Sequence, residues 1–185
     1  LPISIEPMRV IPFKGSWIWK LKILPRIQAF VWKCMHHSIG INQCLLARGM
    51  QIEPNCSRCH SEVESILHAL RDCPLSKSVW YQLGGEHQIP FSLPEFADWL
   101  NTNATSGQQH TSGQIPWNLV FLFGVWLLWK GRNQLIFNNN NQNPSLANEI
   151  VDHASKYHFC INNSLATKRM VLKSIKWEKL RNDWL

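Results

Sequence analysis

The chain has 185 residues and a formal net charge of +7 at pH 7, and 45% of its residues are hydrophobic. That length holds one ordinary domain or two small ones, and the basic charge suggests an anionic partner such as nucleic acid. The longest apolar run, eleven residues from Leu119 to Trp129, is too short to cross a bilayer, which takes about 20 residues.

Helical patterns begin after residues 1–12, which carry three prolines and which we expect to be an extended lead-in. Pro25 stands at a first helical turn, and apolar residues then recur at helical spacing. They are Ile27, Phe30, Val31, Cys34 and Met35. The pattern predicts an amphipathic helix with His36 and His37 in its last turn, where positive charge is favourable; a second metal site at these histidines is the alternative. A shorter helix is expected to end at Gly49.

Four potential metal ligands follow within eighteen residues, in the spacing Cys-x2-Cys-x8-His-x4-Cys. They are Cys56, Cys59, His68 and Cys73. Three thiolates and one imidazole complete the closed tetrahedral shell of a structural Zn2+. Such a shell has no open position for a substrate or a reactive water. We therefore expect this site to hold a fold together and not to do chemistry.

The residues between the ligands favour a short helix. Ser61 followed by Glu64 fits a capping box, and the apolar residues after it recur at helical spacing. His68 lies off that apolar stripe and is free to face the first two cysteines. Pro74 disfavours the α conformation at Cys73, so the helix should end there and let Cys73 turn back to the ion.

Three other interpretations of these cysteines exist. Cys56-x-x-Cys59-His60 also matches the attachment pattern of c-type haem, but haem attachment needs export and we expect no signal sequence. A redox Cys-x-x-Cys normally follows a strand in a βαβ unit, which this pattern lacks. The third is a set of unrelated free cysteines. A zinc site of thiolates indicates a nuclear or cytoplasmic protein, and the three remaining cysteines should stay reduced and metal-free. These are Cys34, Cys44 and Cys160.

The rest of the chain predicts more helices separated by polar breaks. Residues 75–83 show helical spacing up to Gly84, and Ser92 and Glu95 cap a short helix. Residues 101–114 contain no large apolar side chain and indicate a flexible linker. Residues 117–137 predict a long helix, apolar all round in its first half and therefore buried, and a helix after Pro144 makes a hairpin with it.

We thus predict an all-α chain whose units are a small helical zinc-binding domain and a helical hairpin. The boundaries are 1–12 for the lead-in, 13–83 for the zinc-binding domain, 84–116 for a short helix and linker, 117–167 for the hairpin and 168–185 for a basic tail. A charge run like this tail is most often a solvated surface.

Several motifs occur in one order between residues 17 and 83. They are Trp17-Ile-Trp19, Pro25-Arg-Ile-Gln-Ala-Phe30-Val-Trp32, Leu45-x-x-Arg48-Gly49, the four ligands and Val79-Trp80. Together they resemble the zinc-binding domain that follows the polymerase in plant non-LTR retrotransposons. The stretch Trp126-Leu-Leu-Trp129-Lys-x-Arg132-Asn133 resembles the helical segment before a ribonuclease H domain in the same polyproteins. Ile39-Gly-Ile-Asn42 departs from the usual Leu-Pro-Thr and Ser57 from the usual proline, but neither is a ligand.

The resemblance implies a non-catalytic module of a reverse transcriptase polyprotein that binds template RNA or target DNA by its phosphates. Arg58, Arg71 and Lys77, near the ligands, are the candidate contacts. The alternative is a protein-interaction or spacer module between polymerase and ribonuclease H domains. We expect no enzyme, because the chain lacks a Tyr-x-Asp-Asp and the spaced acids of a two-metal nuclease, and a deaminase would need His-x-Glu followed by Pro-Cys-x-x-Cys. We expect no membrane or small-molecule partner.

Overall fold

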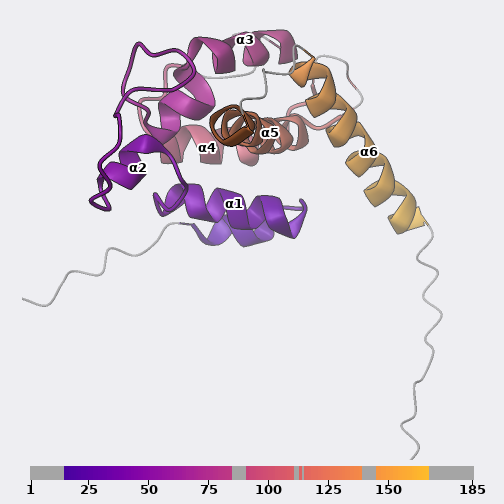
Figure 1. Cartoon of the computed structure of the whole chain (residues 1–185). Coiled ribbons are helices and arrows are strands. Elements are labelled where there is room, and N and C mark those ends of the chain that lie inside the picture. Colours follow the sequence, from indigo (N-terminus) through magenta and orange to yellow (C-terminus); the bar gives the residue numbers. More distant parts are fainter. Residues whose placement is uncertain (1–14, 85–90, 111–112, 114, 139–144, 167–185) are drawn as a thin grey trace, which may run out of the picture.

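The structure is a computed structural model that describes residues 15–84, 91–110, 113, 115–138 and 145–166 (Figure 1). The predicted lead-in and basic tail lie outside these residues. The predicted all-α class is confirmed. The elements in chain order are η1 (Ser16–Lys20), α1 (Pro25–Met35), α2 (Asn42–Leu46), η2 (His68–Asp72), α3 (Pro74–Leu83), α4 (Phe96–Ala104), α5 (Trp117–Asn138) and α6 (Leu146–Ala166). Within the described residues, strand-like pairing is limited to two isolated bridges, Asn55–Val63 and Gln109–Pro116.

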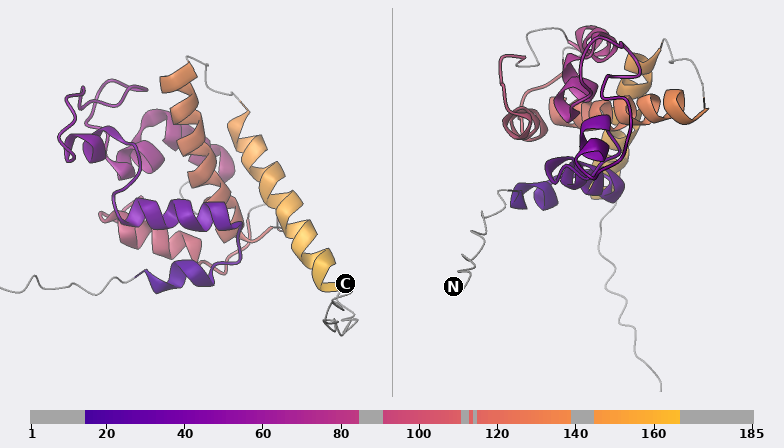
Figure 2. Two further views of the ribbon diagram at one scale, coloured as in Figure 1. Left: turned by 60° about the horizontal axis from the view of Figure 1, so that its bottom comes forward. Right: turned by 60° about the vertical axis from the view of Figure 1, so that its left-hand side comes forward.

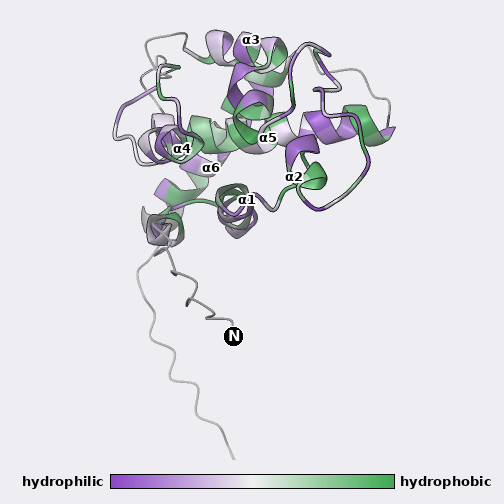
Figure 3. Ribbon diagram, turned by 90° about the vertical axis from the view of Figure 1, so that its left-hand side faces the viewer, coloured by the Kyte–Doolittle hydropathy of each residue, from purple (hydrophilic) through white to green (hydrophobic). Residues whose placement is uncertain are grey.

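Helix α5 runs through the centre of the molecule, with α1, α3, α4 and α6 packed around it (Figures 1 and 2). Its first half is apolar on every side, as the sequence predicts, and nearly every residue from Trp117 to Leu128 is buried. Its hydropathy changes after Trp129 to a hydrophilic stretch (Figure 3). A helix without a polar face has to be covered all round, so α5 sets the positions of its neighbours.

Helix α1 covers one side of α5 and begins as predicted, with Pro25 at its first position. Its apolar stripe is buried, and Phe30 meets Trp126 of α5 with ring centroids 5.3 Å apart. The helix ends at Met35, and His37 then takes a positive φ of 50°. Both histidines at this end are exposed.

The predicted pairing of α5 with α6 is present, but the pair shares its core with the rest of the chain. Ile150 and Ala154 of α6 are buried against α5, and the same cluster of buried residues extends to Ile18 and Leu70. A hairpin that formed a separate unit would have a core of its own. The difference arises because α6 covers only one side of α5, so the other sides need η2, α1 and α4.

The segment predicted as a flexible linker makes specific contacts in its described part. Residues 101–104 are the last turn of α4, and Asn103 Oδ1 accepts a 3.1 Å hydrogen bond from the indole N–H of Trp117. His110 is buried, its Nε2 lies 2.7 Å from the Leu83 carbonyl oxygen, and its ring stacks on Trp117. The polar side chains that suggested a linker thus act as hydrogen-bond partners of buried groups.

Although α5 has 22 residues and is largely apolar, no helix in the described part of the chain combines the length and hydropathy needed to cross a membrane.

The packing of α3 against α5 yields a prediction at Gly124. A methyl group there would lie 2.6 Å from the indole of Trp80, which is fully buried and donates to the Leu70 carbonyl. Gly124→Ala should therefore destabilise the protein by about 1–3 kcal/mol through overpacking. Gly131→Ala on the same helix is the matched control, because nothing lies within 4 Å of its added methyl.

We expect the control to be neutral or to stabilise by up to about 1 kcal/mol, since alanine is the better helix former. Urea unfolding followed by circular dichroism measures both variants. Equal effects of the two substitutions would contradict the close approach of α3 to α5.

Candidate metal centre

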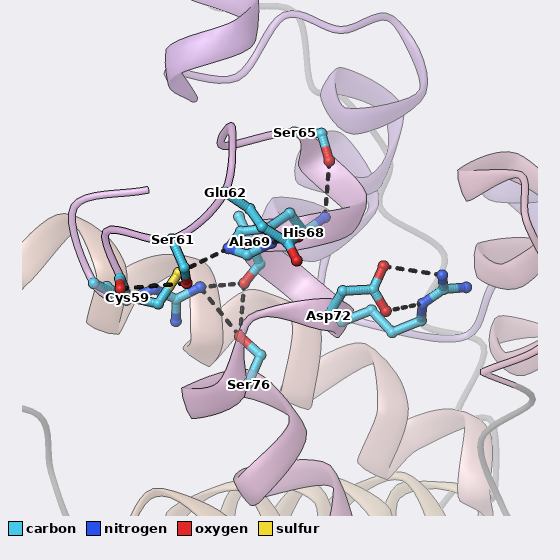
Figure 4. Close-up of polar contacts among 10 residues, drawn as sticks. Cys59, Ser61, Glu62, Ser65, His68, Ala69, Asp72 and Ser76 are labelled. Carbon is cyan, nitrogen blue, oxygen red and sulfur yellow. Dashed lines mark hydrogen bonds and ion pairs between the residues drawn. The ribbon is translucent and has the colours of Figure 1, made fainter. Parts of the chain in front are cut away.

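The four predicted ligands lie together in space, and their ligand atoms are all within 4.8 Å of one another. Cys56 and Cys73 are fully buried, His68 is 4% exposed and Cys59 is at the rim. Cys59 Sγ lies 3.3 Å from His68 Nε2 (Figure 4). Tetrahedral zinc with Zn–S of about 2.3 Å and Zn–N of about 2.0 Å requires S···N of about 3.5 Å. The four side chains therefore fit a single metal ion.

The first two ligands sit at the tip of a small hairpin formed by residues 54–64. Cys56 N–H donates to the Glu62 carbonyl at 2.8 Å, and Glu64 N–H donates to the Pro54 carbonyl at 2.9 Å. His60 N–H closes the turn by donating to the Cys56 carbonyl at 2.8 Å, with a positive φ of 56° at His60. The hairpin thus turns both sulfurs toward the same point, as a Cys-x2-Cys knuckle requires.

The other two ligands are joined by one turn of π-helix in η2, which the sequence did not reveal. Cys73 N–H donates to the His68 carbonyl at 2.8 Å, a bond between residues five apart. In an α-helix five residues advance about 140° beyond a full turn, which would separate the two side chains. The wider π turn brings them to one side. Cys73 then takes φ −54° and ψ 133° before Pro74, so the predicted exit from the helix is confirmed.

The predicted capping box is wrong. Ser61 does not cap this helix; Ser65 Oγ instead accepts the His68 N–H at 2.9 Å (Figure 4). Glu64 is fully buried and points to other partners. Both serines match the preference for small polar residues at a helix start, and the choice between them depends on where the hairpin ends.

Glu62 orients the histidine ligand. Its carboxylate lies 3.1 Å from His68 Nδ1, so the ring donates its Nδ1–H to Glu62 and leaves Nε2 for the ion (Figure 4). A carboxylate behind a ligating histidine fixes the ring and raises its basicity. Sequence reasoning missed Glu62. The available signal was an acidic residue between the second and third ligands, six residues before His68.

The protonation states of the four groups depend on one another. A hydrogen bond from Cys73 lowers the pKa of the Cys56 thiol to about 3, and the same bond raises the pKa of Cys73. Burial disfavours charge on His68, but its hydrogen bonds to Cys56 and Cys59 outweigh burial and raise its pKa. Ion binding to this set would release the remaining protons, so the affinity of the site should fall as pH falls.

The remaining cysteines lie outside the four-residue cluster, which is the one potential metal site found among the described residues. Cys34 and Cys44 are buried in the core and Cys160 is exposed on α6. Burial raises the pKa of Cys34 and of Cys44, which keeps both as neutral thiols.

The three candidate phosphate contacts differ in availability. Arg71 is 5% exposed, because Asp72 and the Leu93 carbonyl accept its hydrogen bonds and its guanidinium lies over Trp99. Arg58 donates to the Ala69 carbonyl and to Ser76 Oγ. Lys77 is half-buried and makes no ion pair with a described residue. Of the three, Arg71 is therefore the least available to a phosphate.

A buried ionic network holds the base of the knuckle hairpin. Arg132 of α5 donates through Nε and Nη2 to the Glu64 carboxylate, and through Nη1 to the Gly40 carbonyl at 2.7 Å. Asn42 donates to the Glu53 and Asn55 carbonyls, and its own side-chain oxygen accepts from Arg132. All three network side chains are less than 9% exposed. The network joins α2, the hairpin and α5.

This network generates a stability prediction. Glu64→Gln keeps the shape of the side chain but leaves the Arg132 charge unpaired in the core, which should cost about 3–5 kcal/mol. Asp152→Asn is the matched control, because it makes the same change in an exposed pair with Lys156. The control should change stability by less than about 1 kcal/mol. Guanidinium unfolding measures both, and a Glu64→Gln variant as stable as the control would contradict the network.

The ligand assignment is tested by metal content. Cys56→Ser should abolish stoichiometric metal, and Glu62→Gln should weaken the affinity about 10–100-fold because the histidine loses its orienting partner. Cys160→Ser is the control, since this exposed cysteine lies outside the cluster, and it should keep one ion per chain. Elemental analysis and chelator competition give the two readouts. Full metal content in Cys56→Ser would refute the assignment.

Comparison with known proteins agrees with this site. Residues 6–80 match the family described as zinc-binding in reverse transcriptase. An Arabidopsis thaliana protein named "Putative ribonuclease H protein" is 29% identical over 126 residues, which are 68% of this chain and 20% of that protein. The chain therefore spans about one fifth of the length of this curated relative. No solved structure matches. Residues 6–80, which contain all four clustered ligands, are thus similar to the zinc-binding domains of reverse transcriptase.

Proposed function

We propose that this chain is a non-catalytic module of a retrotransposon reverse transcriptase polyprotein, and that it binds Zn2+ as a structural ion and the phosphate backbone of RNA or DNA. The single observation that carries the structural role is the closed ligand set. Three sulfurs and one imidazole converge within 4.8 Å, and this set fills a tetrahedral shell without an open position for a reactant.

Zinc is the ion that the donor set favours. Cys3His is a known structural zinc composition, whereas Mg2+ and Ca2+ prefer oxygen ligands. The family match over residues 6–80 supports the same choice. The knuckle contains no helix between residues 51 and 65, and the network of Arg132, Glu64 and Asn42 holds its base and not its tip. A bound ion would hold the hairpin against η2.

The polyprotein setting is supported by the size of the relative. The matched region is 20% of a protein named as a ribonuclease H protein, so comparable sequences occur within longer chains. Of the activities in such a polyprotein, we assign none to this chain. Its role would be to hold nucleic acid near neighbouring domains, in the nucleus or the cytoplasm.

Binding through the backbone is supported by the formal charge of +7. Lysine and arginine that neutralise phosphates release counterions, which makes affinity depend on salt and little on sequence. The alternative is a spacer or protein-interaction module. Two exposed aromatic side chains are available for such a contact, Phe137 on α5 at 75% exposure and Phe159 on α6 at 68%.

Titration of labelled single-stranded RNA and duplex DNA with the zinc-loaded chain tests the proposal. With about two to five phosphate contacts, log affinity should fall by roughly 0.7 to 0.9 per contact for each tenfold rise in salt. The slope should not depend on base sequence. No binding at the lowest salt, together with binding to a polymerase or ribonuclease H domain, would refute nucleic-acid binding and favour the spacer.

A further inference from the structure

Among the described residues, two sets of cations have different surroundings. Near the knuckle, Arg58, Arg71 and Arg132 donate to the chain's own oxygens. Residues 15–52, by contrast, contain no Asp or Glu, and their basic side chains are all exposed. On and between η1 and α1 these are Lys20, Lys22, Arg26 and Lys33, whereas Arg48 follows α2 and donates to the His37 carbonyl. The surface of η1 and α1 is therefore the more available basic surface of the described chain.

A pocket opens beside this surface, between α1, α5 and α6. It is lined by Arg26, Phe123, Trp126, Leu127, Lys130 and His153, and contains about 310 Å³ of empty space, part of it open to solvent. No carboxylate is among the lining residues. Glu149 is paired with one of these lining residues, its carboxylate lying 3.7 Å from His153 Nε2.

Two cations of this pocket are available for a ligand. Within the part of the chain that the structure describes, Arg26 and Lys130 have neither a hydrogen bond nor an ion pair with another residue. They come from different helices, α1 and α5, yet line the same space. Two unpaired cations facing one opening favour an anion, and arginine suits the several oxygens of a phosphate.

Apart from Leu127, the rest of the pocket wall is aromatic. Phe123 stacks on His153 with centroids 5.9 Å apart, and Trp126 is half-buried beside Trp129. About 60 Å³ of this space can hold a ligand, well below the roughly 300–1,000 Å³ of small-molecule sites, so the pocket suits one phosphate group and not a whole nucleotide. Aromatic faces beside cations are the pattern by which proteins hold unpaired bases.

The basic surface continues from the pocket along α1. Arg26 and Lys33 are seven residues apart, so both lie on one side of the helix, about 10 Å from each other along its axis. On η1, which packs against α1, Trp19 is 57% exposed next to Lys20. A strand of nucleic acid lying along α1 would thus meet further cations and an aromatic ring beyond the pocket.

We propose that the pocket formed by Arg26, Lys130 and Trp126 is a phosphate site for one nucleotide of a single-stranded nucleic acid that lies along α1. This proposal rests on the nucleic-acid binding proposed above. It places the main phosphate contact at Arg26 and Lys130, on α1 and α5, and not at the knuckle. A single strand is favoured over a duplex because the aromatic wall and Trp19 need unstacked bases.

The test compares two double variants with the same charge change. Arg26→Ala with Lys130→Ala removes the two pocket cations, whereas Arg48→Ala with Lys156→Ala removes two exposed cations that do not line the pocket. The probes are labelled 12-nucleotide single-stranded RNA and DNA of the same mixed sequence, and the corresponding duplex. Zinc content and circular dichroism verify that each variant is folded.

The pocket variant should lose at least tenfold in affinity for the single strands, and its salt slope should fall by roughly 1.4, about 0.7 for each lost contact. The control variant should keep most of the affinity and most of the salt slope. Arg26→Lys with Lys130→Arg keeps the charges and should retain binding, which separates loss of charge from loss of fold.

Other outcomes overturn the proposal at distinct points. If wild type binds the single strands but both double variants weaken equally, the pocket is not a site and only diffuse charge matters. Tighter binding of the duplex than of either single strand would refute the single-strand assignment. If wild type binds no nucleic acid but binds a poly-glutamate peptide in a pocket-dependent way, the partner is an acidic protein, and the proposed function fails together with this site.

Discussion

The buried ion pair between Glu64 and Arg132 is the interaction on which the arrangement of this protein depends. A carboxylate that is fully buried and a guanidinium at 3% exposure would destabilise the core strongly if either lacked its partner. They come from segments 68 residues apart in the chain. Satisfying both charges therefore requires the knuckle hairpin, α2 and the second half of α5 to meet at one place, which relates the metal centre to the central helix.

The metal centre and the ion pair hold opposite ends of the same hairpin. At the tip, Cys56 and Cys59 face His68 and Cys73. At the base, Asn42 and Glu64 hold the hairpin strands through their hydrogen bonds. The π turn between His68 and Cys73 is a consequence of this arrangement, since η2 has to present two ligands on one side while Leu70 stays in the core.

Demands of the core also decide which cations remain for a partner. Arginines close to the metal neutralise or cap the chain's own groups, as Arg58 does with the Ala69 carbonyl. Their side chains stabilise the knuckle and are poorly placed to contact phosphates. On α1 the apolar stripe faces α5, and Arg26 and Lys33 are left on the solvent side. Proximity to the knuckle in sequence is thus a poor guide to which basic side chains are left exposed.

The sequence by itself determined the four clustered residues, the all-α class and the buried nature of α5. These features are readable because they depend on short-range spacing: Cys-x2-Cys needs only a turn, and an apolar helix without a polar face must be buried. Only the tertiary structure decided that Glu64 pairs with Arg132 and does not cap a helix, and that the Arg71 guanidinium packs on the ring of Trp99. The tertiary structure also decided that His110 is buried and that α6 packs into the same core as η2. The physical reason is that the cost of burying a polar group depends on partners distant in the chain. No local pattern around Glu64 or Arg71 specifies those partners.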